Sequence, residues 1–195
     1  MDMGVNHSLG SDRPRAQGES LVTQLVDCTF ERHAMPILDI FNEVIRNSTA
    51  LFDYRERSAE TMIAWFAAKQ AGRFPVIGVE DPQGRLLGFA SYGSFRAWPA
   101  YQYTVEHSVY VHAGHRGTGI GRQLLRALIE RARDQQYHVL VGGIEAGNGA
   151  SIALHESLGF ALAGTVREVG YKFGRWLDLC FYQLTLETPA NPQET

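Results

Sequence analysis

A glycine-rich loop between a predicted strand and a predicted helix constrains the fold of this 195-residue chain more than any other feature. The stretch VYVHAGHRGTGIGRQLLRALIERAR begins at Val109 and passes from alternating apolar residues through glycines into an amphipathic run. Leu124, Leu125 and Leu128 lie on one apolar stripe, which predicts a helix from Gly119 onward. The N-terminus of a helix leaves backbone N–H groups unpaired and carries a partial positive charge. The loop is therefore suited to hold a phosphate or a pyrophosphate.

The spacing of the glycines disfavours the two common nucleotide-binding loops. Gly117, Gly119 and Gly121 permit close backbone approach and positive φ angles. A dinucleotide-binding G-x-G-x-x-G motif that starts at Gly117 needs a third glycine where Arg122 stands. A P-loop that starts at Gly114 needs Lys and then Ser or Thr, but the chain continues with Ile-Gly. Two interpretations of the loop remain: it binds a different phosphate-bearing ligand, or it is only a tight turn between a strand and a helix.

The other patterns predict one domain over residues 21–187, between a flexible leader at 1–20 and a flexible tail at 188–195. Apolar and alternating runs predict strands at 21–30, 74–80, 85–95, 103–111, 137–146 and 177–186. Helical spacing predicts helices at 35–47, 58–72 and 148–160 besides the one after the glycine loop. The order strand, loop, helix, strand predicts a right-handed parallel crossover inside a mixed sheet.

Composition excludes several classes of partner. The net charge of −3 gives no basic excess for a nucleic acid. The apolar runs are far shorter than the roughly 20 residues that span a bilayer, and the N-terminus lacks the pattern of a signal peptide. Cys28 and Cys180 are too few for a disulfide framework and fit a reducing compartment. We therefore expect a cytoplasmic protein without a nucleic-acid or membrane partner.

Four segments in order resemble one enzyme family. RGTGIG at 116–121 resembles the Q/R-x-x-G-x-G/A signature of GNAT acyltransferases. TVEHSVYV, IEAGNGASIALHESLGF and GYKFGRWLDLCFYQL resemble segments of its phosphinothricin and methionine sulfoximine or methionine sulfone acetyltransferase branch. The resemblance implies an α/β fold with a central mixed, mostly antiparallel sheet flanked by helices. It also implies a homodimer with acetyl-CoA as co-substrate and no metal.

The resemblance assigns cofactor contacts to three places. The backbone of the glycine loop and the start of the next helix would hold the CoA pyrophosphate, and the VYV backbone would pair with the pantetheine amides like an added strand. An asparagine and a serine near the following helix would contact the same ligand. The implied residues are Val109, Tyr110, Val111, Arg116, Gly117, Thr118, Gly119, Ile120, Gly121, Arg122, Asn148 and Ser157.

The chemistry needs a base, because an ammonium has no lone pair with which to attack a thioester. Glu106 matches the glutamate of the family segment before VYV, and its pKa must be raised by burial, or it must act through a water. His155 stands where many members carry a tyrosine that protonates the departing thiolate. His155 either donates that proton or only shapes the pocket.

The resemblance also assigns substrate contacts on both sides of the predicted base. They are Arg96, Ala97, Trp98, Glu106, His107, Ser108, Tyr171, Lys172 and Phe173. An arginine fork suits a carboxylate, and an aromatic side chain can wall a small pocket. The spacing of His107, His112 and His115 matches no common metal-ligand signature, so we predict no metal site.

These features predict an acetyl-CoA-dependent N-acetyltransferase. Its substrate would be the α-amino group of a small amino acid such as methionine sulfoximine, methionine sulfone or phosphinothricin, with Glu106 as general base. The alternatives are a GNAT enzyme for another small amine or a peptide N-terminus, and a module that binds acetyl-CoA without catalysis.

Overall fold

The computed structural model of the protein describes residues 22–194. Within this range seven strands form one sheet in the order β1-β2-β3-β4-β5-β7-β6. The β4–β5 pair is parallel and the other neighbouring pairs are antiparallel, which confirms the predicted mixed sheet and crossover. The strands are β1 (Gln24–Asp27), β2 (Val76–Glu80), β3 (Leu86–Ser94), β4 (Thr104–Val111), β5 (Val139–Glu145), β6 (Ala161–Lys172) and β7 (Arg175–Thr185).

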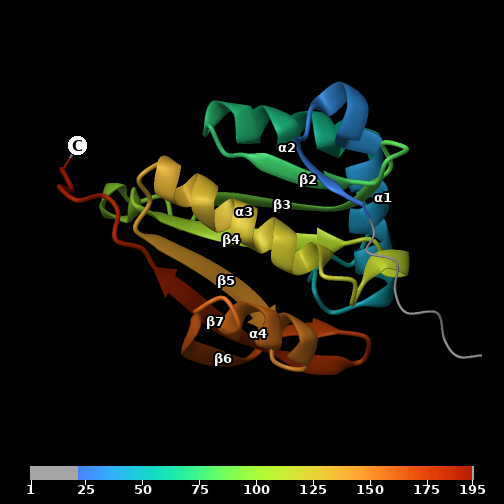
Figure 1. Ribbon diagram of the computed structural model, residues 1–195. Helices are drawn as coiled ribbons and strands as arrows, with labels where there is room; N and C mark the ends of the chain where they lie inside the picture. The colour runs from blue at the N-terminus through green and yellow to red at the C-terminus, as the bar shows by residue number, and fades with distance from the viewer. Residues whose placement is uncertain (1–21, 195) are drawn as a thin grey trace, which may run out of the picture.

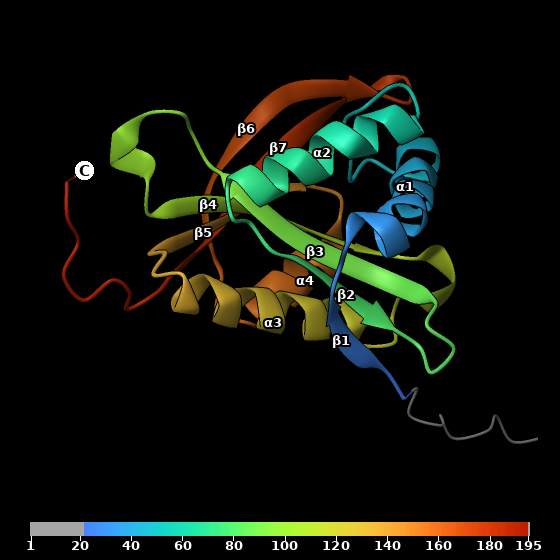
Figure 2. The same ribbon diagram turned by 90° about the horizontal axis from the view of Figure 1, so that it is seen from above.

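Helices cover both faces of the sheet (Figures 1 and 2). α1 (Phe30–Asn47) and α2 (Ala59–Ala71) lie on one face, and α3 (Ile120–Asp134) and α4 (Gly149–Glu156) lie on the other. Short 3₁₀ turns at Pro99–Tyr101 and Ala113–His115 flank β4. β4 lies at the centre of the sheet, so its two faces look toward different helix pairs.

The side chains of β4 alternate between two hydrophobic cores, because successive residues of a strand point to opposite faces of the sheet. Val105 is buried in the core under α3, and Val109 and Val111 pack against that core. Tyr110 packs against the second core, under α1 and α2. Glu106 and Ser108 share the face of Tyr110, because residues two apart in a strand point the same way.

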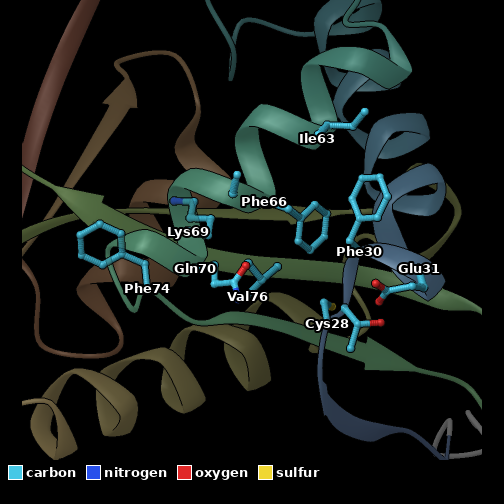
Figure 3. A pocket seen from close by; sticks show the side chains of 11 residues that line it. Cys28, Phe30, Glu31, Ile63, Phe66, Lys69, Gln70, Phe74 and Val76 are labelled. Atoms are coloured by element: carbon cyan, nitrogen blue, oxygen red, sulfur yellow. The ribbon is translucent and has the colours of Figure 1, made fainter.

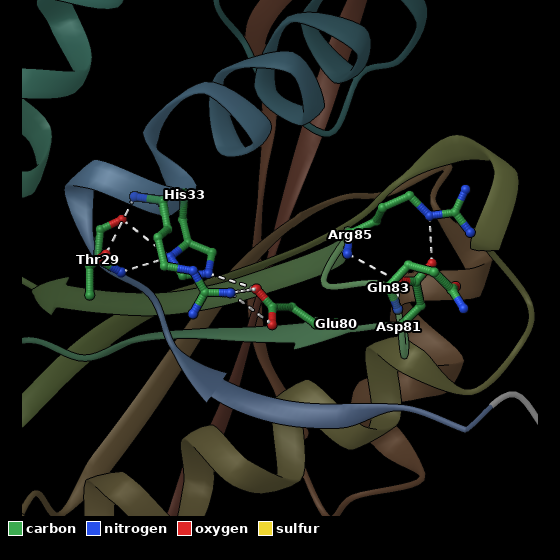
Figure 4. A network of polar contacts seen from close by, with 7 residues as sticks. Thr29, His33, Glu80, Asp81, Gln83 and Arg85 are labelled. Atoms are coloured by element: carbon green, nitrogen blue, oxygen red, sulfur yellow. Dashed lines mark hydrogen bonds and ion pairs between the residues drawn. The ribbon is translucent and has the colours of Figure 1, made fainter.

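The start of α1 differs from the prediction, because a polar network fixes it to β2. The helix begins at Phe30, five residues before the expected start, with Thr29 as its N-cap. The Thr29 N–H donates to His33 Nδ1 (2.8 Å), and His33 Nε2–H donates to the buried Glu80 carboxylate (2.9 Å). Figure 4 shows this network beside the hairpin turn, where Asp81 accepts from the Gln83 N–H.

The twelve-residue strand β6 was absent from the predictions, because its sequence lacks the usual alternation. Almost every residue of β6 is exposed, and the strand pairs with β7 along one edge. A strand without a buried face carries no apolar repeat for sequence reasoning to detect. The strand also brings Lys172 back to the end of α1, far from β6 in sequence.

The structure describes most of the predicted C-terminal tail but not the predicted N-terminal leader. The predicted leader at 1–20 lies outside the described residues. The predicted tail runs along the surface, where the Gln193 N–H donates to the Tyr103 hydroxyl (2.9 Å) and Thr188 accepts from His138 (2.9 Å). Over residues 22–194, the structure contains no helix that is both long and apolar enough to span a membrane.

Candidate active site

The site begins where β4 and β5 separate. Their parallel register runs from Thr104 to His107 on β4 and ends there, although β4 continues to Val111 and β5 to Glu145. Over the same stretch β4 keeps its pairing with β3 on the other side. The β5-facing edge of β4 therefore offers backbone groups to an extended ligand that carries amides.

A cleft of about 760 Å³ opens at this separation. It lies between the glycine loop, the end of β4, the start of α4 and the segment after α1. Of the predicted cofactor-binding residues, it is lined by Val109, Tyr110, Val111, Arg116, Gly117, Gly119, Gly121, Arg122 and Asn148. Thr118 lies in the loop between these residues, Ile120 is the first residue of α3, and Ser157 accepts a hydrogen bond from the cleft residue Arg122 (2.7 Å).

The glycine loop has the geometry of an anion site. Gly117 and Gly119 have φ of +78° and +91°, which side chains resist, and Gly119 is the N-cap of α3. A Cβ at either glycine would meet no atom of the described residues within 4 Å, so the backbone angle rather than crowding requires glycine. The first N–H groups of α3 have no partner inside the helix and face an incoming anion.

Two arginines add positive charge to this end of the cleft. Arg116 pairs with Glu43 and donates to the Val111 carbonyl (3.2 Å). Arg122 is held by Ser157. Because both guanidinium groups are fixed and line the cleft, they complement a doubly charged group such as a pyrophosphate.

Asn148 occupies the opposite wall as the N-cap of α4. Its side-chain carbonyl accepts from the Ser151 N–H (3.1 Å), so a bond to a ligand would come from its NH₂ group. Nearby, the buried Glu145 accepts from the Thr49 hydroxyl (2.9 Å) and ties the segment after α1 to β5. No sequence pattern predicted this contact between Thr49 and Glu145.

Glu106 faces a separate, smaller pocket of about 190 Å³ under α1 and α2. Burial raises the pKa of Glu106, and the charge of Arg96 partly opposes this effect. A raised pKa brings the carboxylate closer to the range of a useful general base. Tyr110 lines both this pocket and the large cleft, so the two hollows adjoin at β4.

Aromatic rings build the walls of the Glu106 pocket. The Phe41 ring lies 5.0 Å from Phe89 and 5.7 Å from Trp65, both edge-to-face. Arg57 and Lys69 add two cations to the lining. Sequence reasoning missed all of these residues, because they come from α1, α2, the intervening loop and β3 and belong to no motif.

His107 and His155 form a buried pair on the other face of β4. The His155 Nδ1–H donates to the Ser151 carbonyl (2.7 Å), so the neutral ring presents a bare Nε2, which accepts from His107 Nε2–H (2.9 Å). Burial lowers the pKa of His155, and burial together with His155 lowers the pKa of His107 to about 3. Both nitrogens of His155 are thus engaged, which favours a pocket-shaping role over proton donation.

His107, a predicted substrate contact, is buried on the face of β4 opposite Glu106. The strand alternation turns its side chain away from the Glu106 pocket and into the core, where it also packs against Phe160 (5.1 Å between rings). It therefore lies outside the place where the resemblance put a substrate contact.

The predicted segment Arg96, Ala97 and Trp98 lines a third hollow of about 210 Å³, with Phe74 and Tyr137. Trp98 is 74% exposed. Of these three residues, Arg96 affects the predicted base, because its positive charge lowers the pKa of Glu106. Within this single chain, the other two stand apart from the Glu106 pocket.

The predicted contacts near the end of β6 also differ from one another. Phe173 lines the large cleft and is exposed. The Tyr171 carbonyl accepts from the Tyr54 hydroxyl (2.6 Å). The Lys172 ammonium is buried and donates to the Ile45 carbonyl in the last turns of α1 and to the Ser48 and Leu51 carbonyls after it, so its protons are already used.

Another hollow, of about 460 Å³, lies between α2, the start of α1 and β2 (Figure 3). Its lining includes Cys28, and burial raises the pKa of this thiol to about 12, which makes it a poor nucleophile. In the part of the chain that the structure describes, no group of three or more His, Cys, Asp or Glu side chains could hold a metal ion.

Comparison with known proteins decides the family. Residues 37–160 match the model of the acetyltransferase (GNAT) family. The chain belongs to the GNAT family. It is 49% identical over 151 residues to an L-methionine sulfoximine/L-methionine sulfone acetyltransferase of Pseudomonas paraeruginosa, a match that covers 77% of this chain and 88% of the relative.

Two further relatives broaden the comparison. An L-amino acid N-acyltransferase of Escherichia coli is 45% identical over 80% of this chain and 90% of its own length. The structure of a GNAT superfamily phosphinothricin acetyltransferase from Sinorhizobium meliloti, in complex with acetyl-CoA, superposes with a TM-score of 0.83 at 32% identity. That match covers 89% of this GNAT chain and 93% of the other.

These findings confirm the predicted family, fold class and enzyme class, and they confirm acetyl-CoA as the family's co-substrate. The residues of this GNAT chain fit that molecule. The free edge of β4 suits the amides of its pantetheine arm, and the glycine loop with Arg116 and Arg122 suits its pyrophosphate.

Proposed function

We propose that this enzyme transfers the acetyl group of acetyl-CoA to the α-amino group of a small amino acid. The preferred substrates are methionine sulfoximine, methionine sulfone and phosphinothricin, the compounds in the names of its relatives. One observation carries the proposal: Glu106, a carboxylate with a raised pKa, faces a small aromatic pocket that adjoins the large cleft at Tyr110.

The residues support a direct transfer. Glu106 takes a proton from the substrate ammonium, and the freed amine attacks the thioester carbonyl. A C–N bond forms, the C–S bond breaks, and the CoA thiolate leaves to be protonated by water. Backbone N–H groups on the free edge of β4, near Tyr110, stabilise the oxyanion that develops on the carbonyl. His155 lines the cleft without giving a proton.

The test is CoA release across an amine panel, with Glu106→Gln as the variant. We expect this variant to lose about 10²- to 10⁴-fold in kcat and to keep its affinity for CoA. Glu187→Gln, an exposed glutamate just after the end of β7, is the matched control. Unchanged turnover in Glu106→Gln would refute the base assignment.

The panel also separates the alternatives. Turnover of other amines or peptide N-termini, without turnover of the three named amino acids, would overturn the proposed substrate class. Affinity for acetyl-CoA without acetylation of any amine would indicate a binding module.

We further propose a cytoplasmic homodimer. β6 is an edge strand, and exposed edges with apolar side chains promote association. Its exposed apolar residues and those of the adjoining turn and β7 are Leu162, Val166, Val169, Tyr171, Phe173 and Trp176. The free thiols Cys28 and Cys180 support a reducing compartment. Sedimentation equilibrium should give twice the chain mass of 21.7 kDa, and a monomer would refute the assembly.

A further inference from the structure

The lining of the Glu106 pocket contains two cations that the α-ammonium group of a substrate, itself a cation, cannot pair with. Arg57 and Lys69 line it together with Glu106 and a set of aromatic rings. The substrate ammonium is matched by the Glu106 carboxylate. Arg57 and Lys69 are therefore the two candidates to face other groups of the acceptor.

Arg57 is held in place at three points. The Asn42 side chain accepts from the Arg57 N–H (2.8 Å) and donates to the Arg57 carbonyl (3.0 Å). The guanidinium carbon lies 4.0 Å from the centre of the Phe41 ring, and Nη2 lies 2.9 Å from Asp53 Oδ2. The side chain is 25% exposed. A fixed, partly desolvated guanidinium that keeps further N–H donors is well prepared to bind an oxyanion.

Lys69 is less suited to that task. Its ammonium donates to the Tyr92 carbonyl (2.7 Å) and lies 5.3 Å from the Trp65 ring centre. Burial lowers the pKa of Lys69 to about 8, so its charge is partly lost in mildly alkaline solution.

The two arginines near the pocket act on different parts of it. Arg96 acts on the Glu106 carboxylate, beside which the reacting amine must lie. Arg57 lines the pocket itself, with its guanidinium over the Phe41 ring, whereas Arg96 lies outside this lining. In an α-amino acid the α-carboxylate is attached to the carbon that carries the amine, so it belongs near Arg96. The end of the side chain then extends toward Arg57.

We infer that Arg57 is a specificity-determining residue that favours acceptors whose side chain ends in an oxyanion, such as a phosphinate. This inference rests on the proposed function. It divides the proposed substrates into two groups, because phosphinothricin carries a negatively charged methylphosphinate where methionine sulfone carries a neutral methylsulfonyl group on the same carbon chain. The two compounds differ in charge at the atoms that approach Arg57.

The test compares kcat/KM for phosphinothricin and for methionine sulfone in the same enzyme preparations. Arg57→Met keeps an unbranched chain over Phe41 and removes the charge. We expect it to lower the phosphinothricin value about 10- to 100-fold and the methionine sulfone value less than about threefold. Arg57→Lys should retain part of the preference, because a lysine keeps the charge but loses the planar fork. Arg55→Met, on the same loop with an exposed side chain, is the matched control and should leave the ratio unchanged.

The ratio of the two values protects the test from folding effects. A partly unfolded variant lowers both values by the same factor, so the ratio depends on the folded enzyme alone. Arg57→Gln serves as a second neutral variant if Arg57→Met is insoluble. An unchanged ratio in the neutral variants, with or without a loss of activity, would overturn the role of Arg57 and leave the proposed function standing. If the unmodified enzyme acetylated neither compound, the proposed function would fail and this inference would fail with it.

Discussion

The Lys172 ammonium should be a structural anchor, and Lys172→Met tests this directly. Lys172 is only 4% exposed. Its Nζ donates to the carbonyls of Ile45 (2.9 Å), Ser48 (2.9 Å) and Leu51 (2.7 Å). These bonds join the end of β6 to the end of α1 and to the segment that borders both the cleft and the Glu106 pocket.

The size of the effect follows from these contacts. A hydrogen bond to a charged group contributes about 1.5–3 kcal/mol, so three set an upper bound of about 4.5–9 kcal/mol. Burial opposes part of this gain, as the lowered pKa of Lys172 shows. The released carbonyls can also bind water. We therefore expect a loss of about 3–5 kcal/mol in the free energy of unfolding, in the range seen when one partner of a buried charged contact is removed.

The assay is urea-induced unfolding of the enzyme without ligands. Arg167→Met, an exposed cation on the same strand, is the control and should change the free energy of unfolding by less than about 0.5 kcal/mol. The sequence-based prediction of a substrate contact gives the opposite pattern. If Lys172→Met lost turnover while it unfolded at the same urea concentration as Arg167→Met, the anchoring role would be refuted.

Two further predictions concern the buried histidine pair and the glycine loop. Because the folded His107 binds no proton until pH falls to about 3, while an unfolded histidine binds one below about 6.5, the free energy of unfolding should fall as pH drops from about 6.5. His107→Asn should flatten that decline in urea titrations at several pH values, and an identical slope would contradict the assignment. Gly119→Ala should raise the KM for acetyl-CoA and cost about 1–2 kcal/mol of stability, because alanine resists φ of +91°. Gly149→Ala, where a Cβ meets open space, is the comparison, and equal effects in both variants would refute the backbone argument.

Much of the fold was predictable because it rests on local repeats. The stripe of Leu124, Leu125 and Leu128 predicted α3, and the alternating run at 103–111 predicted the strand β4. The predicted start of α1 was wrong, because the observed start depends on a contact between His33 and Glu80, which are 47 residues apart in the sequence. β6 was missed, because a strand exposed on both faces has no apolar repeat.

The candidate site divides along the same line. The glycine loop, the free strand edge and Glu106 lie in one continuous stretch of sequence, so their roles could be proposed from the sequence alone. The hydrogen bonds at both His155 nitrogens could not be predicted, because the bond to His107 requires β4 and α4 to be in contact. The sequence also could not predict that Arg57 lines the Glu106 pocket, or that Lys172 donates to three backbone carbonyls.

The sequence by itself determined the glycine loop and the helix start of the proposed pyrophosphate site, since the direction of N–H groups at a helix N-terminus is set by a few neighbouring residues. Only the tertiary structure decided what lies opposite Glu106. The rings of Phe41 and Trp65 and the cation of Arg57 converge there through the packing of α1 and α2 on the sheet. Such convergence depends on strand register and helix position over the whole domain, which no short sequence pattern encodes.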